Sequence, residues 1–269
     1  MTTVRPPAVA GRFYPGQTGS LAGSVERLLG NARASHVTDR PPKALISPHA
    51  GYVYSGPTAA NCYASLDGAR DLIKRVVLLG PAHHVAFRGL ALAGVDAFQT
   101  PLGVVLVDHE AEAKLAGLAV TTSLKVHAQE HSLEVQLPFL QEELPAFALV
   151  PLAVGDATPE EVADVIDALW GGPETLVVVS SDLSHYLPYA SAQRVDRSTV
   201  RQILDLAWPL TDHSACGARA INGLLLAATR HSLHPRLISM CNSGDTAGDA
   251  SRVVGYAAIA FEEVSDVTT

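Results

Sequence analysis

Short apolar segments alternate with longer amphipathic segments along this chain. Runs rich in valine, isoleucine and leucine have the length of β-strands, and we expect strands at 43–47, 75–79, 90–95, 103–107, 147–154, 175–180, 236–240 and 253–261. Segments with helical periodicity lie between them, at 17–30, 109–118, 130–143, 158–170, 191–206 and 213–230. Strands that alternate with helices are typical of an α/β fold with a mixed, mainly parallel central sheet flanked by helices.

The chain contains no linker, repeat or low-complexity tract that would divide it. The polar segment 31–42 is short, and we expect it to be a loop. A length of 269 residues suits one α/β domain. The mean hydropathy of +0.19 also agrees with buried parallel strands, which are apolar on both faces. We therefore predict a single domain over residues 1–269.

The overall charge argues against two classes of partner. The formal net charge is −8, and the 19 lysines and arginines form no basic cluster. Nucleic-acid binding needs many cations that neutralise phosphates, and an anionic membrane surface would repel an acidic chain. We therefore expect neither nucleic acid nor a membrane as a partner.

The cysteines and the apolar runs indicate the compartment. The three cysteines are Cys62, Cys216 and Cys241, and a sparse, odd set does not make a disulfide framework. No run approaches the roughly 18 apolar residues that span a bilayer, and residues 1–16 lack the apolar core of a signal peptide. We expect a reduced, cytoplasmic protein.

Four predicted strands end next to side chains that can bind a metal ion or transfer a proton. Ligands in open α/β sheets bind beyond the carboxyl ends of the strands. The groups are His49 after strand 43–47, His83 and His84 after strand 75–79, Asp182 and His185 after strand 175–180, and Asp245 and Asp249 after strand 236–240. We therefore expect His49, His83 and His185 to converge on one pocket.

Each group also has an ordinary structural explanation. A histidine after a strand often only makes a hydrogen bond in a loop, Asp182 or Ser184 could cap a helix, and segment 243–249 is rich in turn-forming residues. Any one of these explanations is sufficient alone. Four such groups at one edge of one sheet favour a functional site.

The residue types suit a divalent metal ion. Two histidines and one carboxylate leave coordination positions open for substrate and dioxygen, the pattern of non-haem Fe(II) oxygenases. Neutral imidazole is a good metal ligand near pH 7. A further histidine outside the ligand set could transfer protons, with Asp182 setting its tautomer.

A second motif points to a different metal site. The stretch His127-Ala-Gln-Glu130-His131 matches H-x-x-E-H, a zinc metallopeptidase signature. On a helix, His127 and His131 would share a face as zinc ligands, with Glu134 one turn further. The pattern is short, and it also suits polar contacts at a helix N-terminus. We expect His127 to point away from the pocket, and His131 and Glu134 to line or support it.

Several motifs occur in an order that resembles the Memo family. They are AGRFYP (10–15), SPHAGYVYSG (47–56), LGPAHH (79–84), TPLG (100–103), EHSLEVQLPFL (130–140), SSDLSHY (180–186), CGARAI (216–221) and SGDTAGDASRVVGYAAIAF (243–261). The pair PHAGYxYSG and GPxHH is specific, and the motifs extend over nearly the whole chain. Bacterial and archaeal members of this family are component B of the AmmeMemoRadiSam system.

The resemblance implies a fold and a set of pocket residues. The fold would be similar to that of class III extradiol dioxygenases, which hold Fe(II) with two histidines and a glutamate and use another histidine as acid and base. By position in the motifs, His49 and His83 correspond to the two metal-binding histidines. His185 corresponds to the additional pocket histidine, and Asp182 to its neighbour.

The resemblance leaves the third metal ligand to be chosen. In the animal Memo protein it is a cysteine, and Thr246 stands at that position here. We expect the neighbouring carboxylate of Asp245 to be the ligand, with Cys241 as the alternative. A carboxylate favours Fe(II) or Mn(II), whereas a thiolate favours Cu(I) or zinc. The side chains expected to support the pocket are His84, His131, Glu134, Cys216 and Cys241.

Two functions follow from this pocket. The first is that of a non-haem, Fe(II)-dependent, dioxygenase-like oxidoreductase in which His185 and Asp182 are catalytic. The second is that of a non-catalytic binding or scaffold protein that uses the same pocket. The ligand would be a small molecule, such as a phenol, or a peptide. The resemblance also implies a functional link to AMMECR-type and radical SAM proteins.

Overall fold

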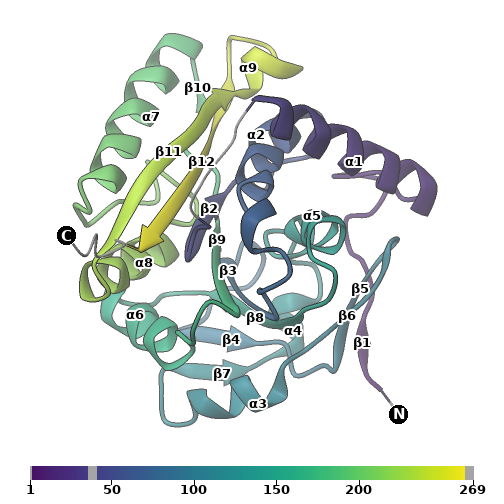
Figure 1. Cartoon of the computed structure of the whole chain (residues 1–269). Coiled ribbons are helices and arrows are strands. Elements are labelled where there is room, and N and C mark those ends of the chain that lie inside the picture. Colours follow the sequence, from purple (N-terminus) through teal and green to yellow (C-terminus); the bar gives the residue numbers. More distant parts are fainter. Residues whose placement is uncertain (1, 36–40, 264–269) are drawn as a thin grey trace, which may run out of the picture.

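A large mixed β-sheet forms the centre of the fold (Figure 1). The computed structural model describes residues 2–35 and 41–263. In spatial order, the strands are β10 (His185–Leu187), β12 (Val253–Glu263), β2 (Ala44–Ser47), β9 (Thr175–Ser180), β3 (Arg75–Pro81), β8 (Ala148–Val154), β4 (Leu90–Leu92) and β7 (Val120–Thr122). Strand β11 (Leu233–Asn242) lies outside this path and pairs with β12.

The centre of the sheet is parallel, and antiparallel pairs lie on either side of it. Strands β2, β9, β3 and β8 pair in parallel, whereas β12 runs antiparallel to β2 and β4 runs antiparallel to β8. Strands β2 and β9 pair through their last residues, Ser47 and Ser180. The carboxyl ends of β2, β9 and β3 therefore lie side by side at one edge. The expected α/β class with a mixed sheet is confirmed.

Helices cover both faces of the sheet (Figure 1). Helices α1 (Thr18–Ser35), α2 (Tyr52–Ala64) and α5 (Leu137–Glu143) lie on one face, and α6 (Pro159–Ala168), α7 (Tyr189–Leu204) and α8 (Ala218–Arg230) lie on the other. Successive side chains of a strand point to opposite faces, so Leu45 packs with the first group and Ile46 with the second. Burial on both faces explains why the central strands are apolar at nearly every position.

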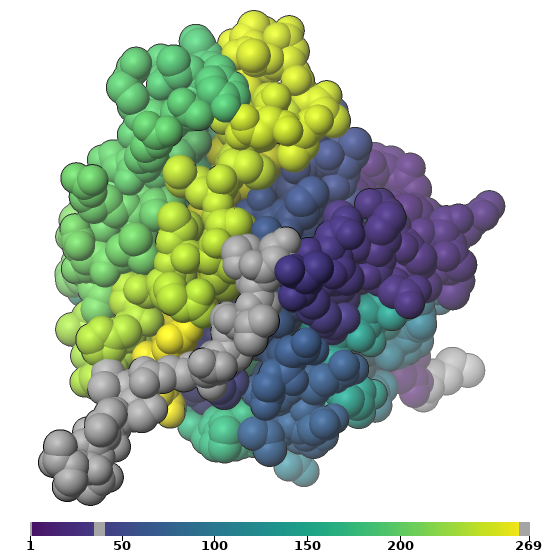
Figure 2. Space-filling model, turned by 45° about the horizontal axis from the view of Figure 1, so that its top comes forward, coloured from purple at the N-terminus to yellow at the C-terminus, as the bar shows by residue number. Residues whose placement is uncertain are grey.

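Shorter elements complete the chain. A separate small sheet contains β1 (Val4–Arg5), β5 (Ala97–Thr100) and β6 (Gly103–Leu106). The short helices are α3 (His109–Glu112), α4 (Leu124–His127) and α9 (Ser243–Thr246), with 3-10 turns at η1 (Asp67–Ala69), η2 (Ala113–Leu115) and η3 (Glu134–Gln136). Figure 2 shows α1 and α2, in purple and blue, on one side of the C-terminal hairpin and α7, in green, on the other. No helix in the described part of the chain is long and apolar enough to cross a membrane.

Local capping decides where two of the expected helices begin. Helix α6 begins as expected, because Thr158 forms a capping box with Glu161 and is followed by a proline at the first helical position. The expected helix 130–143 is wrong over its first turn, because the Glu130 carboxylate accepts the next two backbone N–H groups. Residues 31–35 of the expected loop belong to α1, while 36–40 lie outside the described residues.

The sequence does not indicate helix α2, because it contains the helix-disfavouring pair Gly56-Pro57. Packing explains the helix. A Cβ atom on Gly56 would lie 3.1 Å from Leu28 Cδ1, so the glycine lets α1 and α2 approach closely. Helix α2 begins after Gly51, directly behind the segment that carries His49, and it therefore helps to position that segment.

Candidate metal centre

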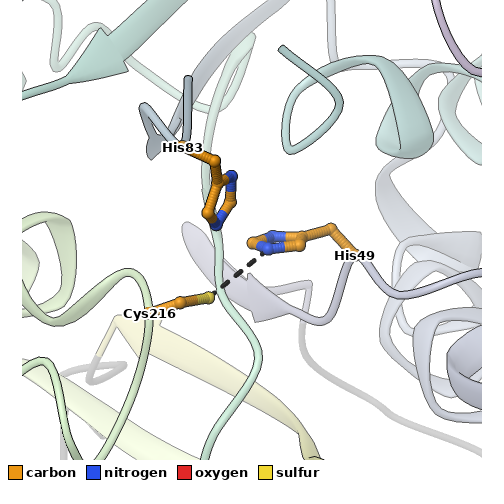
Figure 3. Close-up of side chains that lie close together, drawn as sticks. All are labelled: His49, His83 and Cys216. Atoms are coloured by element: carbon orange, nitrogen blue, oxygen red, sulfur yellow. Dashed lines mark hydrogen bonds between the residues drawn. The ribbon is translucent and has the colours of Figure 1, made fainter. Parts of the chain in front are cut away.

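Two histidines and a cysteine point toward one another beyond the carboxyl ends of β2 and β3 (Figure 3). His49 follows β2 and His83 follows β3, as expected, while Cys216 precedes α8. One ligand atom of each residue lies within 4.8 Å of the others, and His49 Nε2 is 3.4 Å from Cys216 Sγ. Two such atoms at ~2.1 and ~2.3 Å from one ion would stand about 3.6 Å apart in a tetrahedral site. The donor set therefore fits a transition metal ion.

Glu130 orients the ring of His83. The Glu130 carboxylate accepts hydrogen bonds from the backbone N–H of His83 at 2.6 Å and from its ring Nδ1 at 2.9 Å. Burial alone would raise the pKa of Glu130, but the hydrogen bonds that the carboxylate accepts from His83 and from the backbone N–H of Ser132 hold its pKa below the usual range. Because an ionised carboxylate only accepts, Nδ1 of His83 carries the proton and Nε2 is free to bind a metal.

Ser180 orients the ring of His49. The Ser180 hydroxyl donates to the carbonyl of Ser132 at 2.6 Å and accepts from Gln136 Nε2 at 2.8 Å. Gln136 is itself oriented by Tyr63, whose hydroxyl donates to its Oε1. The remaining lone pair of Ser180 faces His49 Nδ1 at 2.8 Å. Because the hydroxyl has already donated its one proton, it can only accept from the ring, so His49 is protonated on Nδ1 and presents a free Nε2 to the cluster.

Burial favours the uncharged forms of the imidazole and the thiol. His49 is 2% exposed, and desolvation together with the rings of His83 and His131 lowers its pKa. Desolvation and the carboxyl group of Asp182 raise the pKa of the Cys216 thiol to about 12. The imidazole is thus in the form that binds metal, whereas the thiol needs the charge of a bound cation to lose its proton.

His131 lies beside the cluster and shares Glu130 with His83. Its ring stacks on that of His83 with centroids 4.7 Å apart, and desolvation lowers its pKa to about 4. These two histidines and Glu130 have the spacing of a second metal site. The Glu130 carboxylate, however, already accepts N–H groups from His83, His131 and Ser132. We therefore assign Glu130 an orienting role.

A pocket next to the cluster contains His185. This His185 pocket has a volume of about 440 Å³, and its lining includes Phe13, Tyr54, His131, Asp182, His185, Tyr186, Asp249, Arg252 and Tyr256. The ring Nδ1 of His185 donates to the carbonyl of Leu183 at 2.8 Å, so Nε2 is free to accept a proton. Burial lowers the pKa of His185, which keeps the ring neutral.

Asp182 does not set the tautomer of His185, contrary to expectation, because the carbonyl of Leu183 does so. The Asp182 carboxylate instead accepts the backbone N–H of His49 at 2.8 Å and is also stabilised by that of Ala50. Desolvation nevertheless raises the pKa of Asp182 to about 7. Asp182 therefore holds the His49 segment in place and offers a titratable group to the His185 pocket.

The structure does not bring Asp245 to the two histidines, and Cys216 stands there as the third donor. The Asp245 carboxylate closes a capping box at α9 by accepting the N–H of Asn242 at 2.9 Å, and it also accepts the hydroxyl of Tyr189. Thr246, at the position of the family cysteine, is the last residue of the same short helix. Local capping thus uses the carboxylate that we expected to bind metal.

Glu134 anchors the N-terminal segment rather than the pocket. It is fully buried, pairs with Arg5 at 2.6 Å and accepts the hydroxyl of Tyr14 at 2.6 Å. These bonds hold the segment that carries Phe13, whose ring lies 4.7 Å from that of His131. The support that Glu134 provides to the pocket is therefore indirect.

Two further residues that we expected to support the pocket lie at its margin or beyond it. His84 is exposed, and its ring meets the edge of His131 with centroids 6.1 Å apart. The thiol of Cys241 is 3.1 Å from Thr58 Oγ1, and Cys241 is in neither group of metal-capable residues found in the described chain. Of the cysteines, only Cys216 therefore contributes to the cluster.

The H-x-x-E-H stretch lacks the geometry of a zinc metallopeptidase. Helix α4 ends at His127 and the chain turns before Glu130, so His127 and His131 do not share a helix face. The His127 ring donates from Nε2 to the carbonyl of Ala91 at 2.8 Å and lies against Phe98. His127 thus points away from the pocket, as expected.

The residues that orient His49 and His83 are not evident from the sequence. Glu130 and Ser180 each begin a motif of the Memo-family resemblance, EHSLEVQLPFL and SSDLSHY, but neither motif indicates that its first residue orients a histidine. Cys216 was given a supporting role, although it begins the motif CGARAI. The available signal was the position of Ser180 at the carboxyl end of β9, directly beside the end of β2.

Known proteins that resemble this chain agree on one family. The Memo-like protein family matches residues 5–260. A MEMO1 family protein of Methanosarcina barkeri is 35% identical over 273 residues, which cover 96% of this chain and 100% of the relative. This chain belongs to the Memo-like protein family. MEMO1 family proteins of Aquifex aeolicus and Metallosphaera sedula are 34% and 32% identical, each across 96% of this chain and 99% of the relative.

In this Memo-like protein, the segments that carry the resemblance also build the cluster. SPHAGYVYSG supplies His49, LGPAHH supplies His83 and CGARAI supplies Cys216. The resemblance seen in the sequence is therefore confirmed, and its motifs have a common location in space.

Proposed function

We propose that this Memo-like protein is a metal-dependent oxidoreductase whose metal ion is bound by His49, His83 and Cys216. One observation carries the proposal: these three donors converge, while Glu130 and Ser180 hold both imidazole protons away from the cluster. Three protein ligands leave coordination positions open, as catalytic metal sites require.

Fe(II) is the ion that we propose first. Two imidazoles with one anionic ligand and open positions resemble non-haem iron sites that bind substrate and dioxygen. A thiolate from Cys216 in place of a carboxylate makes zinc and copper the alternatives. The bound ion would supply redox and Lewis-acid chemistry beside the His185 pocket.

The His185 pocket would hold the substrate. Its aromatic residues, among them Phe13, Tyr54 and Tyr256, suit a small aromatic ligand such as a phenol. His185 Nε2 would accept the proton of a bound hydroxyl group, because the carbonyl of Leu183 fixes the other ring nitrogen as a donor.

The second candidate function is that of a binding or scaffold protein that uses the same pocket without turnover. One observation favours it. None of the three cluster residues is among the described residues that line the His185 pocket. A ligand could therefore be held by the aromatic and polar wall alone, with no need of a metal ion.

Metal analysis of protein prepared without oxygen tests the proposal. Apo protein incubated with Fe(II), Zn(II) or Cu(I) should retain one ion per chain after dialysis. Cys216→Ser should lower that content, whereas Cys241→Ser, a matched change outside the cluster, should not. Oxygen uptake by the Fe(II)-loaded protein with a panel of phenols and catechols then tests turnover.

The outcomes distinguish the two functions. Oxygen uptake that requires both Fe(II) and a panel compound supports the oxidoreductase. Tight binding of a panel compound that does not change on removal of the metal favours the binding protein. Wild-type protein that takes up no metal under reducing, oxygen-free conditions contradicts the metal-dependent enzyme.

A further inference from the structure

Two separate pockets lie beside the candidate metal centre. The first is the His185 pocket. The second, the Cys216 pocket, has a volume of about 270 Å³, and its lining includes His83, Ala86, Asp156, Asp212, Cys216 and Arg219. Among the described residues, none lines both pockets. His49 is 2% exposed and lines neither pocket. It contacts Cys216, which lines the second pocket, and Asp182, which lines the first, so the cluster lies between the two pockets.

The two pockets present different chemical groups. Two of the three metal donors, His83 and Cys216, line the Cys216 pocket. In Figure 3 they approach the cluster from the side opposite the backbone of His49. The His185 pocket instead presents the proton-transferring groups His185 and Asp182 among aromatic rings. Metal donors therefore face one pocket, and acid–base groups face the other.

The charges of the two pockets also differ. In the Cys216 pocket, Arg219 forms an ion pair with Asp156. Asp212 makes no ion pair within the described part of the chain, so this pocket carries a net negative charge. In the His185 pocket, Arg252 offsets Asp249, and the third acidic group, Asp182, is buried and carries only part of a negative charge near pH 7 because desolvation raises its pKa to about 7. A divalent cation is therefore attracted more strongly to the Cys216 pocket.

We propose that the metal ion enters and leaves through the Cys216 pocket, while the organic ligand occupies the His185 pocket. This inference rests on the proposed metal centre. Asp212 concentrates cations at the entrance, and Cys216 and His83 are the first protein donors that an incoming ion meets. With separate routes, a ligand in the His185 pocket does not obstruct exchange of the metal.

Plugging each pocket in turn tests the two routes. Ala86 and Asp249 are exposed residues on the walls of the Cys216 and His185 pockets, so Ala86→Trp and Asp249→Trp form a matched pair. Uptake of Co(II) by the apo protein is followed without oxygen through the thiolate-to-cobalt absorption band, and release is followed into excess chelator. Ala86→Trp should slow both rates by the same factor, about tenfold or more, because a narrowed route hinders both directions equally. Its Kd for Co(II) should not change, and Asp249→Trp should leave both rates as in the wild type.

Two substitutions that remove charge form a second matched pair. Asp212→Asn should slow Co(II) association about threefold at low ionic strength, and the difference should disappear at high salt. Asp249→Asn removes the same charge from the other pocket and should leave the association rate unchanged.

Alkylation of Cys216 gives a readout that needs no metal. The reaction of the apo protein with iodoacetamide is quantified for the Cys216 peptide by mass spectrometry. Ala86→Trp should slow this reaction, and Asp249→Trp should not, because the thiol is reached from the Cys216 pocket.

The results separate this inference from the proposed metal centre. A wild-type protein that never develops the cobalt–thiolate band contradicts the metal centre itself. A normal band with uptake slowed only by Asp249→Trp, or slowed by neither plug, overturns the separate route. Uptake and alkylation that are both slowed only by Ala86→Trp support it.

Discussion

His49 and His127 are both buried histidines, yet they have different roles. They are 2% and 1% exposed, and desolvation lowers the pKa of each. His49 bonds through Nδ1 to Ser180 and turns Nε2 toward Cys216. His127 donates from Nε2 to the carbonyl of Ala91, and its Nδ1 has no hydrogen-bond partner in the described structure.

The comparison shows that burial and neutrality do not make a histidine a metal ligand. In each ring, one nitrogen is hydrogen-bonded to an oxygen atom and the other nitrogen is not. Around His49, the remaining nitrogen meets a second imidazole and a thiol. Around His127, the neighbouring ring is that of Phe98, and His127 is in neither metal-capable group of the described residues. The number of further donors within reach distinguishes the two sites.

Removal of the imidazole at position 49 and at position 127 should give the largest difference in bound metal between two variants. His49→Ala should reduce bound metal from one ion per chain to nearly none, because loss of a ligand costs more than the ~10–100-fold loss that follows removal of an outer partner. His127→Gln should keep the wild-type metal content, since His127 lies outside the cluster. Elemental analysis after equal dialysis measures both. Similar metal contents in the two variants would contradict the assignment.

His185→Ala should separate metal binding from proton transfer. Metal content should stay near that of the wild type, because His185 is not in the cluster. Turnover of any phenol that the Fe(II)-loaded protein oxidises should fall by roughly 10²–10⁴-fold, the usual share of general acid–base catalysis. Oxygen uptake at saturating substrate measures the effect. Unchanged turnover would remove His185 from the mechanism.

His127 should make the fold less stable in acid. Burial lowers its pKa from 6.5 to about 4, so between these values the unfolded chain binds a proton that the folded chain does not. The free energy of unfolding should therefore fall as the pH falls from 6.5 to 4, by about 3 kcal/mol from this group.

Urea unfolding of the wild type and His127→Gln at several pH values isolates this contribution. The glutamine does not titrate, so the stability difference between the two proteins should change with pH over that window. A difference that stays constant from pH 7 to 4 would show that His127 is protonated equally in both states.

Loss of the hydroxyl that orients His49 should have the smallest effect. Ser180→Ala should weaken metal binding about 10–100-fold, because the ring loses the acceptor that fixes its tautomer. Ser184→Ala is the matched control, since Ser184 is an equally buried serine outside the cluster. Competition titration with a chelator measures both affinities. Equal weakening in both variants would indicate general destabilisation instead.

The sequence by itself determined the central strands of the sheet, the family and the positions of two histidines of the cluster. The central strands could be predicted because burial on both faces makes each of them a short apolar run. Parallel strands bring their carboxyl ends to one edge, so His49 and His83, each two residues beyond a strand, could be expected to meet.

Only the tertiary structure decided which donor completes the cluster and which partners orient it. Asp245 has suitable chemistry, but the backbone of α9 uses its carboxylate as a cap. Cys216 is 167 residues from His49 in sequence, and Ser180 is 131 residues from it. Contacts over such separations leave no local periodicity, because they depend on how strands and loops pack after each has formed. The direction of each imidazole proton likewise follows from hydrogen bonds that only the folded chain assembles.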